Sequence, residues 1–168
     1  MSAKPEISAF LALSHSDLTD AYTSGISKIH PGLADLTEEK ADRTFDGTAG
    51  AWSCRMLLGH LLDAEIAFVH RMRRAVAEER PAFTVWQEDD FIDKGLYRSA
   101  SIDETMQALR SLRNWTASWL KSLAGEEFNR VGLHPQRGDQ TVHTILSYCT
   151  WHLEHHAHYL DEKMKRLV

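Results

Sequence analysis

The stretch WHLEHHAH, residues 151–158, places four histidines inside the last helix-period segment of the chain. At about 100° per residue, His152 and His156 lie about 40° apart on one helix face. The same sector carries mostly apolar side chains: Ile145, Cys149, Tyr159 and Leu160. His155 lies on the flank of this stripe, and His158 points farther away. The pattern therefore predicts that His152 and His156 face a helical core.

A second helical segment repeats this arrangement with one histidine. His60 shares its sector with apolar side chains: Met56, Leu57, Ala64 and Ala67. Hydrogen-bonded core histidines are one interpretation, but each unpaired buried polar group costs about 1–3 kcal/mol. One divalent metal on His60, His152 and His156 satisfies all three imidazoles. This ligand set suits Zn²⁺, Ni²⁺ or Fe²⁺, with Mn²⁺ as a further alternative, and leaves coordination positions for water or substrate.

Helical periodicity extends over the rest of the chain, and strand alternation is nearly absent. Ser53 and Ser101 have the positions of helix N-caps. The predicted helices are residues 5–29, 53–79, 101–125 and 141–167. The predicted connections are a loop over 45–50, a long crossover over 80–100 and a polar loop over 134–139. We therefore expect a single all-α four-helix bundle domain over residues 1–168.

Composition narrows the class of protein and its partners. The 168 residues carry a formal net charge of -5 without a dense run of Lys and Arg, which argues against a nucleic-acid partner. No apolar run approaches the roughly 18 residues of a membrane span, and the N-terminus has no signal-peptide pattern. We expect a cytoplasmic protein that does not contact membranes. Cys54 and Cys149 are interpreted as buried apolar residues, because two distant cysteines do not make a disulfide framework.

Other metal motifs are absent from the sequence. There is no His-Glu-x-x-His of a zincin. The Glu-x-x-His pairs of di-iron bundles are absent too, since Phe68 follows Glu65 and Ala157 follows Glu154 at that spacing. Glu65 projects about 140° from His60, which favours a solvated or inter-helix role.

Two further candidates for the chemistry are Asp63 and His155. Asp63 lies about 60° from His60 and is interpreted as a fourth ligand or as an acceptor that orients a ligand imidazole. His155 or Asp63 could shuttle a proton. Arg137 is interpreted as a solvated loop residue, with an acidic group of a thiol as the alternative partner.

Two groups of large apolar or aromatic residues each have a structural and a functional interpretation. Crossover aromatics fit ordinary loop packing, with a pocket wall as the alternative: Trp86, Phe91 and Tyr97. An apolar ridge on the third helix fits core packing, with a dimer face as the alternative: Leu112, Trp115 and Trp119.

Several of these residues form a pattern that resembles the DinB-like (damage-inducible, YfiT-related) superfamily. The second-helix signature is Trp52-Ser53 followed by LLGHLLDAE at 57–65. The loop and last-helix signature is His134-Pro135 with Gly138 and Thr141, followed by HLEHH at 152–156. Order and spacing agree from about Phe45 to Leu160.

The resemblance implies an up-down-down-up four-helix bundle with a long crossover between the second and third helices, often dimeric. It implies that His60, His152 and His156 bind one metal, often nickel or zinc. Relatives in the superfamily include thiol-dependent S-transferases, a mycothiol-dependent isomerase and proposed metal-dependent hydrolases. We therefore expect a metal that activates a thiol or water against a small electrophile. A non-catalytic metal-stabilised binding or stress-response bundle is the alternative.

Overall fold

The computed structural model describes residues 4–46 and 50–167, so residues 47–49 of the predicted loop over 45–50 lie outside the described part. Its helices are α1 (Ile7–Leu11), α2 (His15–Gly25), α3 (Glu38–Asp42), α4 (Cys54–Ala77), α5 (Glu88–Asp93), α6 (Ile102–Leu120) and α7 (Val142–Leu167). Its 3₁₀ helices are Ile26–Lys28, Pro31–Asp35 and Gly125–Asn129, and its strands are β1 (Val131–His134) and β2 (Gly138–Thr141).

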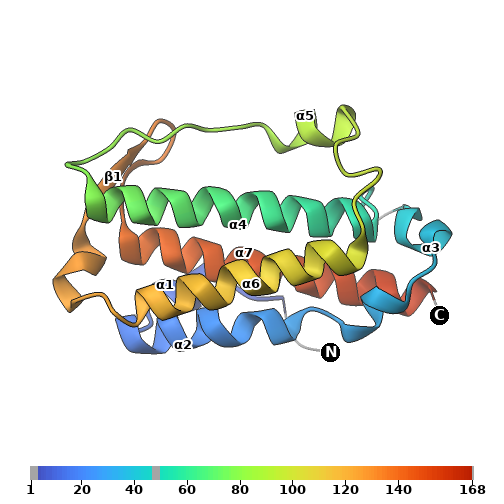
Figure 1. Ribbon diagram of the computed structural model, residues 1–168, viewed down its shortest axis with the longest axis horizontal. Coiled ribbons are helices and arrows are strands. Elements are labelled where there is room, and N and C mark those ends of the chain that lie inside the picture. The colour runs from blue at the N-terminus through green and yellow to red at the C-terminus, as the bar shows by residue number, and fades with distance from the viewer. Residues whose placement is uncertain (1–3, 47–49, 168) are drawn as a thin grey trace.

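Four of the helices, α2, α4, α6 and α7, form the bundle (Figure 1). α4 packs against α6 and α7, and α2 packs against the same two helices. The crossover after α4 returns the chain to the end where α4 began, so α4 and α6 run parallel while α2 and α7 run the other way. The up-down-down-up bundle expected from the sequence is confirmed.

Serine caps set where the bundle helices begin. The Ser53 hydroxyl accepts a hydrogen bond from the Met56 amide, and Ser101 caps α6 in the same way. Ser14 caps α2, so the single first helix predicted over residues 5–29 was wrong: the chain forms α1, turns and starts again. The third helix also ends at Leu120, before Gly125, because a turn and a 3₁₀ helix follow it.

A short hairpin replaces part of the polar loop predicted over 134–139. β1 pairs antiparallel with β2, and His134 lies opposite Gly138. Gly138 has a φ of 73°, a conformation that glycine adopts without steric cost. The sequence indicated no strand here because four residues are too few to show alternation.

An aromatic ring lies on a glycine near each end of the crossover, and these contacts join it to the hairpin and to α4. Near its start, Phe83 lies over Gly132, where a Cβ would come within 2.0 Å of the ring. Near its end, Tyr97 lies over Gly59, where a Cβ would come within 2.3 Å of the ring. The Tyr97 hydroxyl also donates to Asp63 Oδ2 at 2.6 Å. The segment between these contacts runs lengthwise beside α4 (Figure 1).

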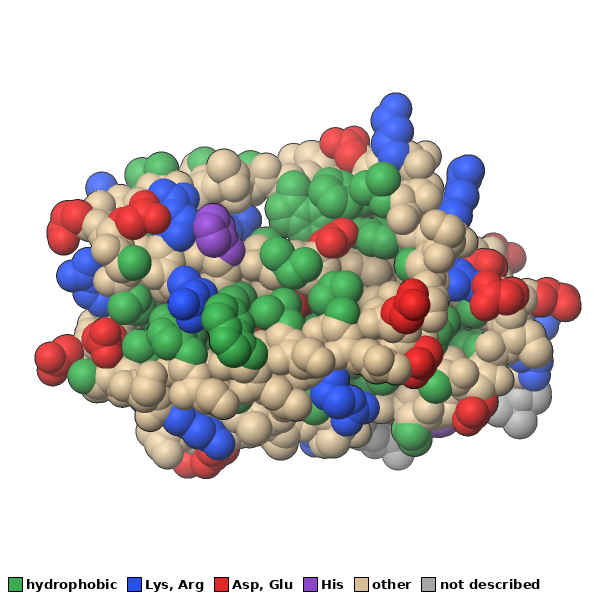
Figure 2. Space-filling model, in the orientation of Figure 1, with side chains coloured by type: hydrophobic (Ala, Val, Ile, Leu, Met, Phe, Trp, Pro, Cys, Tyr) green, Lys and Arg blue, Asp and Glu red, His purple; other side chains and the backbone are tan. Residues whose placement is uncertain are grey.

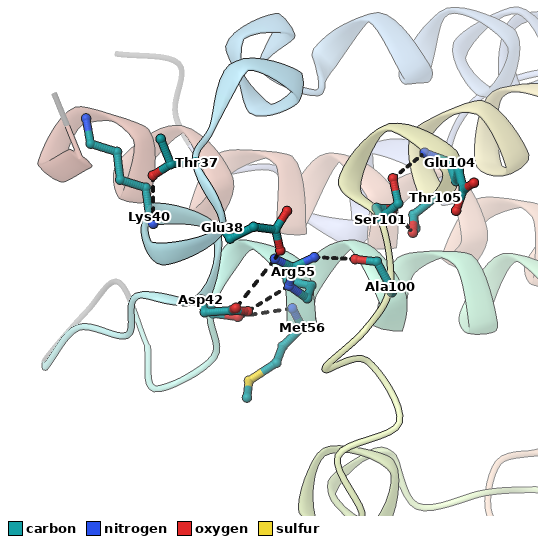
Figure 3. A network of polar contacts seen from close by, with 11 residues as sticks. Thr37, Glu38, Lys40, Asp42, Arg55, Met56, Ala100, Ser101, Glu104 and Thr105 are labelled. Atoms are coloured by element: carbon teal, nitrogen blue, oxygen red, sulfur yellow. Dashed lines mark hydrogen bonds and ion pairs between the residues drawn. The ribbon is translucent and has the colours of Figure 1, made fainter.

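The start of α4 is tied to its surroundings by buried Arg55 (Figure 3). Its Nε donates to Asp42 Oδ1 at 2.7 Å, and its other nitrogens bind Glu38 and the Ala100 carbonyl oxygen. These contacts join α3 and the residue before the α6 cap to α4.

A second buried arginine crosses the bundle core. Arg113 of α6 pairs with Glu65 of α4 at 2.6 Å, and the two side chains are 1% and 3% exposed. Tyr22 of α2 donates its hydroxyl to Glu65, while its ring lies 3.9 Å from the Arg113 guanidinium carbon. Cys149 of α7 contacts the same carboxylate at 3.4 Å. The inter-helix interpretation of Glu65 therefore holds, and the solvated one was wrong.

The apolar ridge of α6 lies partly at the surface. Trp115 is 55% exposed, so its assignment to the core was wrong, whereas Leu112 and Trp119 pack partly against the core. Arg73 of α4 covers both indoles, at 4.6 Å from the Trp115 ring and 5.1 Å from the Trp119 ring. Apolar side chains gather on this face, over α4 and α6 (Figure 2).

Both cysteines are buried and unpaired, as predicted. Within residues 4–46 and 50–167, no helix has the length and apolar character needed to cross a bilayer.

Candidate metal centre

The three predicted histidines meet between α4 and α7. His60 comes from α4, and His152 and His156 come from successive turns of α7. One ring nitrogen from each lies within 4.8 Å of the others. This is the one cluster of three or more metal-ligating side chains in the described part of the chain.

The rings approach one another edge to face. His60 Nε2 lies 3.0 Å from His152 Nε2. The ring centroids are 4.9 Å apart for His60 and His152, 5.0 Å for His60 and His156, and 4.5 Å for His152 and His156. Two nitrogens bound to one ion at about 2.0–2.1 Å lie roughly 2.9 to 3.4 Å apart in octahedral or tetrahedral geometry. The His60–His152 separation falls in this range.

Burial keeps the three imidazoles neutral at ordinary pH. Burial lowers the pKa of His60 to about 4. Burial, with the charge of His60 as the next cause, lowers the pKa of His156 to about 3. The pKa of His152 is also held well below its usual value, first by burial and then by its two neighbours. Neutral imidazole is the form that binds a metal.

The residues fit a metal better than they fit one another. Neutral imidazoles share at most one proton between His60 Nε2 and His152 Nε2, so no set of tautomers pairs all the nitrogens. The buried Nδ1 atoms of His60 and His156 have no hydrogen-bond partner among the described residues. A cation at the converging nitrogens would use the lone pairs of both His60 Nε2 and His152 Nε2, which a single shared proton cannot do.

A cavity of about 460 Å³ opens beside the three histidines. The wall from the bundle comprises Ala64, Ala67, Phe68, Arg71, Trp151 and His155. Trp52 and the crossover residues Val85, Trp86, Gln87, Glu88 and Asp89 form another part, and the hairpin adds His134, Gln136 and Arg137. The histidines are therefore reached from a space large enough for a small molecule.

The other predicted residues divide into two groups. Trp86 lines the cavity with its ring 5.8 Å from that of His60, and His155 lines it beside His156. Asp63 accepts a hydrogen bond from Tyr97 and is not in the histidine cluster, so it is placed to fix the crossover. Phe91 supports Trp86 from outside the cavity, at a centroid distance of 4.9 Å.

Sequence reasoning did not place Arg71 or His134 at the cavity. Arg71 follows His60 by eleven residues, which rotates it by only about 20° from that histidine on the helix. The helical wheel, extended by one more turn, would have found it. His134 was noted as part of a loop signature, but the hairpin that brings it to the cavity was not predicted.

Comparison with known proteins gives a consistent result. A profile of the DinB superfamily matches residues 21–160. A protein of Oceanobacillus iheyensis named "Putative metal-dependent hydrolase" is 24% identical over 80% of this chain and 76% of its own. One of Bacillus licheniformis with the same description is 25% identical over 83% of this chain and 78% of its own.

A solved structure is similar over nearly the whole bundle. YfiT from Bacillus subtilis, described as "a probable metal-dependent hydrolase with an unusual four-helix bundle topology", covers 90% of this chain and 86% of its own. The TM-score is 0.82 at 21% identity, a likeness of fold. With the profile match over most of its length, the chain belongs to the DinB superfamily.

Proposed function

We propose that this protein is a metal-dependent enzyme whose ion, bound by His60, His152 and His156, activates water or a low-molecular-weight thiol against a small electrophile. The observation that carries the proposal is the pairing of three converging neutral imidazoles with an adjoining cavity. The bound ion would supply positive charge that lowers the pKa of the nucleophile. Zinc and nickel are the proposed metals, with iron and manganese as alternatives.

The placement of Asp63 supports an open site over a purely structural one. A structural metal site is closed by four protein ligands. Among the described residues the cluster contains three histidines, and Asp63, the sequence candidate for a fourth ligand, is bonded to Tyr97. Positions on the ion would therefore be available to water or substrate.

The surrounding side chains have separate roles in this proposal. Trp52, Phe68 and Trp86 line the cavity and reduce the access of bulk water. His155 borders the cavity next to His156, so it is the proposed acceptor of a proton from the nucleophile. The names of the hydrolase relatives favour water as the nucleophile, and the superfamily resemblance favours a thiol.

The test is reconstitution of the metal-free protein with Co²⁺, whose absorption spectrum reports changes of ligand. We expect an added thiol to produce a sulfur-to-cobalt band in wild type but not in His156→Ala. Turnover is then assayed with 4-nitrophenyl esters, and with glutathione, bacillithiol or mycothiol plus a bromobimane electrophile. If no thiol or small anion changes the Co²⁺ spectrum, the metal site is closed and the proposed enzymatic function is refuted.

A further inference from the structure

Two arginines enter the metal-site cavity without a carboxylate partner. Arg71 of α4 and Arg137 of the hairpin both line the cavity. Neither forms an ion pair within residues 4–46 and 50–167. Glu88 and Asp89 of the crossover also line the cavity, and both are exposed. Cations that gather in a cavity without a protein counter-ion indicate an anionic ligand.

Each arginine is held in place by a neighbour. Arg71 Nη2 donates to the Thr84 carbonyl oxygen at 2.7 Å. The Arg137 guanidinium carbon lies 4.9 Å from the centroid of the Tyr148 ring. Two fixed guanidinium groups lose less side-chain freedom when they bind an anion than free ones would.

Arg71 and Arg137 line the same cavity, and their charges act on each other. The pKa of Arg71 is lowered, first by burial and then by the charge of Arg137. The positive charges therefore repel one another, and a bound anion relieves that repulsion.

His134 adds a neutral donor to the cavity that the two arginines line. It is buried, and its Nδ1 accepts a hydrogen bond from the Gln136 amide at 3.2 Å, which leaves the proton on Nε2. Burial, with the charges of Arg71 and Arg137, lowers the pKa of His134 and keeps it neutral. The residue thus offers an N–H donor in the same cavity.

The face of α4 that forms the floor of the cavity sets the distance between Arg71 and the metal ligand His60. His60, Ala64, Ala67, Phe68 and Arg71 follow one face of α4, and the two alanines leave room above the helix. Eleven residues span about 16 Å along the axis, and helical side chains lean toward the N-terminus, so Arg71 leans back toward His60.

We propose that Arg71, Arg137 and His134 form a subsite that binds a carboxylate or phosphate group of the substrate, several bonds from the atom that meets the metal. The subsite deepens the proposed function and rests on it for the reacting end of the substrate. Its chemistry selects acidic small molecules over neutral ones of the same length.

The experiment compares matched thiols on the Co²⁺-loaded protein at low ionic strength. The probes are 6-mercaptohexanoate, 6-mercapto-1-hexanol and 6-aminohexane-1-thiol, with pantetheine and its 4′-phosphate as the phosphate arm. We expect the better of the two acidic thiols to bind about tenfold or more tightly than its neutral partner. The better acidic probe identifies the anionic group.

Variants assign this preference to the subsite. We expect Arg137→Gln, at an exposed position, and Arg71→Gln to remove the preference for the acidic thiol over its neutral partner. Arg110 is an exposed arginine of α6, so Arg110→Gln is the matched control and should keep the preference for the acidic thiol. Equal affinities, tighter binding of the amine, or a preference that survives in Arg137→Gln would each overturn the subsite.

A metal-independent arm separates this inference from the proposed function. Pyrophosphate added to the metal-free protein should raise the Tm of wild type and Arg110→Gln, but not of Arg137→Gln. If Co²⁺ does not bind and pyrophosphate still stabilises selectively, the subsite stands and the metal proposal falls. If Co²⁺ binds thiols without preference and pyrophosphate has no selective effect, the subsite alone falls.

Discussion

The buried ion pair of Glu65 and Arg113 gives the sharpest prediction about what stabilises the bundle. Both side chains are almost fully buried, and they meet at 2.6 Å. Arg113→Met would leave the Glu65 carboxylate buried with Tyr22 and Cys149 as its partners among the described residues. Removing one member of a buried pair costs about 3–5 kcal/mol, because the remaining charge is not compensated. For a domain of this size, that loss lowers Tm by about 6–20 °C.

The assay is urea unfolding of the metal-free protein in a double-mutant cycle. We expect the Glu65→Gln/Arg113→Met protein to be more stable than the sum of the single effects predicts, since it buries no charge from this pair. Arg80→Met is the control: its pair with Asp139 has the same 2.6 Å length, but the partners are 56% and 54% exposed. We expect a change below about 1 kcal/mol there. An Arg113→Met protein within 1 kcal/mol of wild type, or additive single effects, would refute the reasoning.

Three further predictions concern the helices that carry the site. Ser53→Ala removes the side-chain acceptor of the Met56 amide and should lower the free energy of unfolding in urea by about 1 kcal/mol. An unchanged free energy of unfolding would show that this cap does not stabilise α4. Gly59→Ala places a methyl group against the Tyr97 ring, so hydrogen exchange across residues 84–97 should accelerate, and an unchanged rate would show that this contact does not hold the crossover. The pKa of His60 is lowered to about 4 by burial, so the unfolded state takes up a proton first as pH falls below 6.5. Metal-free wild type should therefore lose about 2 kcal/mol more than His60→Gln between pH 7 and pH 5, and equal losses would contradict this.

The histidine cluster was predictable because helical periodicity is a local property. His152 and His156 are four residues apart on one helix, and His60 occupies the apolar face of another, so the sequence shows which way each points. Pairing the two faces requires only that the helices pack with their apolar sides together, as they do between α4 and α7.

The partners of the remaining polar residues depend on contacts far apart in sequence. Asp63 meets Tyr97 across 34 residues, and Glu65 meets Arg113 across 48 residues. No periodic pattern links such positions. The surface position of Trp115 was missed for a related reason, because an apolar spacing on α6 does not show that the ring packs beside Arg73 of α4 instead of entering the core.

The measurement that tests the central claim most directly is the metal content of untagged protein purified without added chelator. We expect about one divalent ion per chain in wild type and in His158→Ala, whose side chain is outside the cluster. His60→Ala and His156→Ala each remove a ligand and should carry well below half an ion per chain. Circular dichroism checks that both variants fold. Equal, substoichiometric metal in wild type and all variants would contradict a metal centre on these histidines.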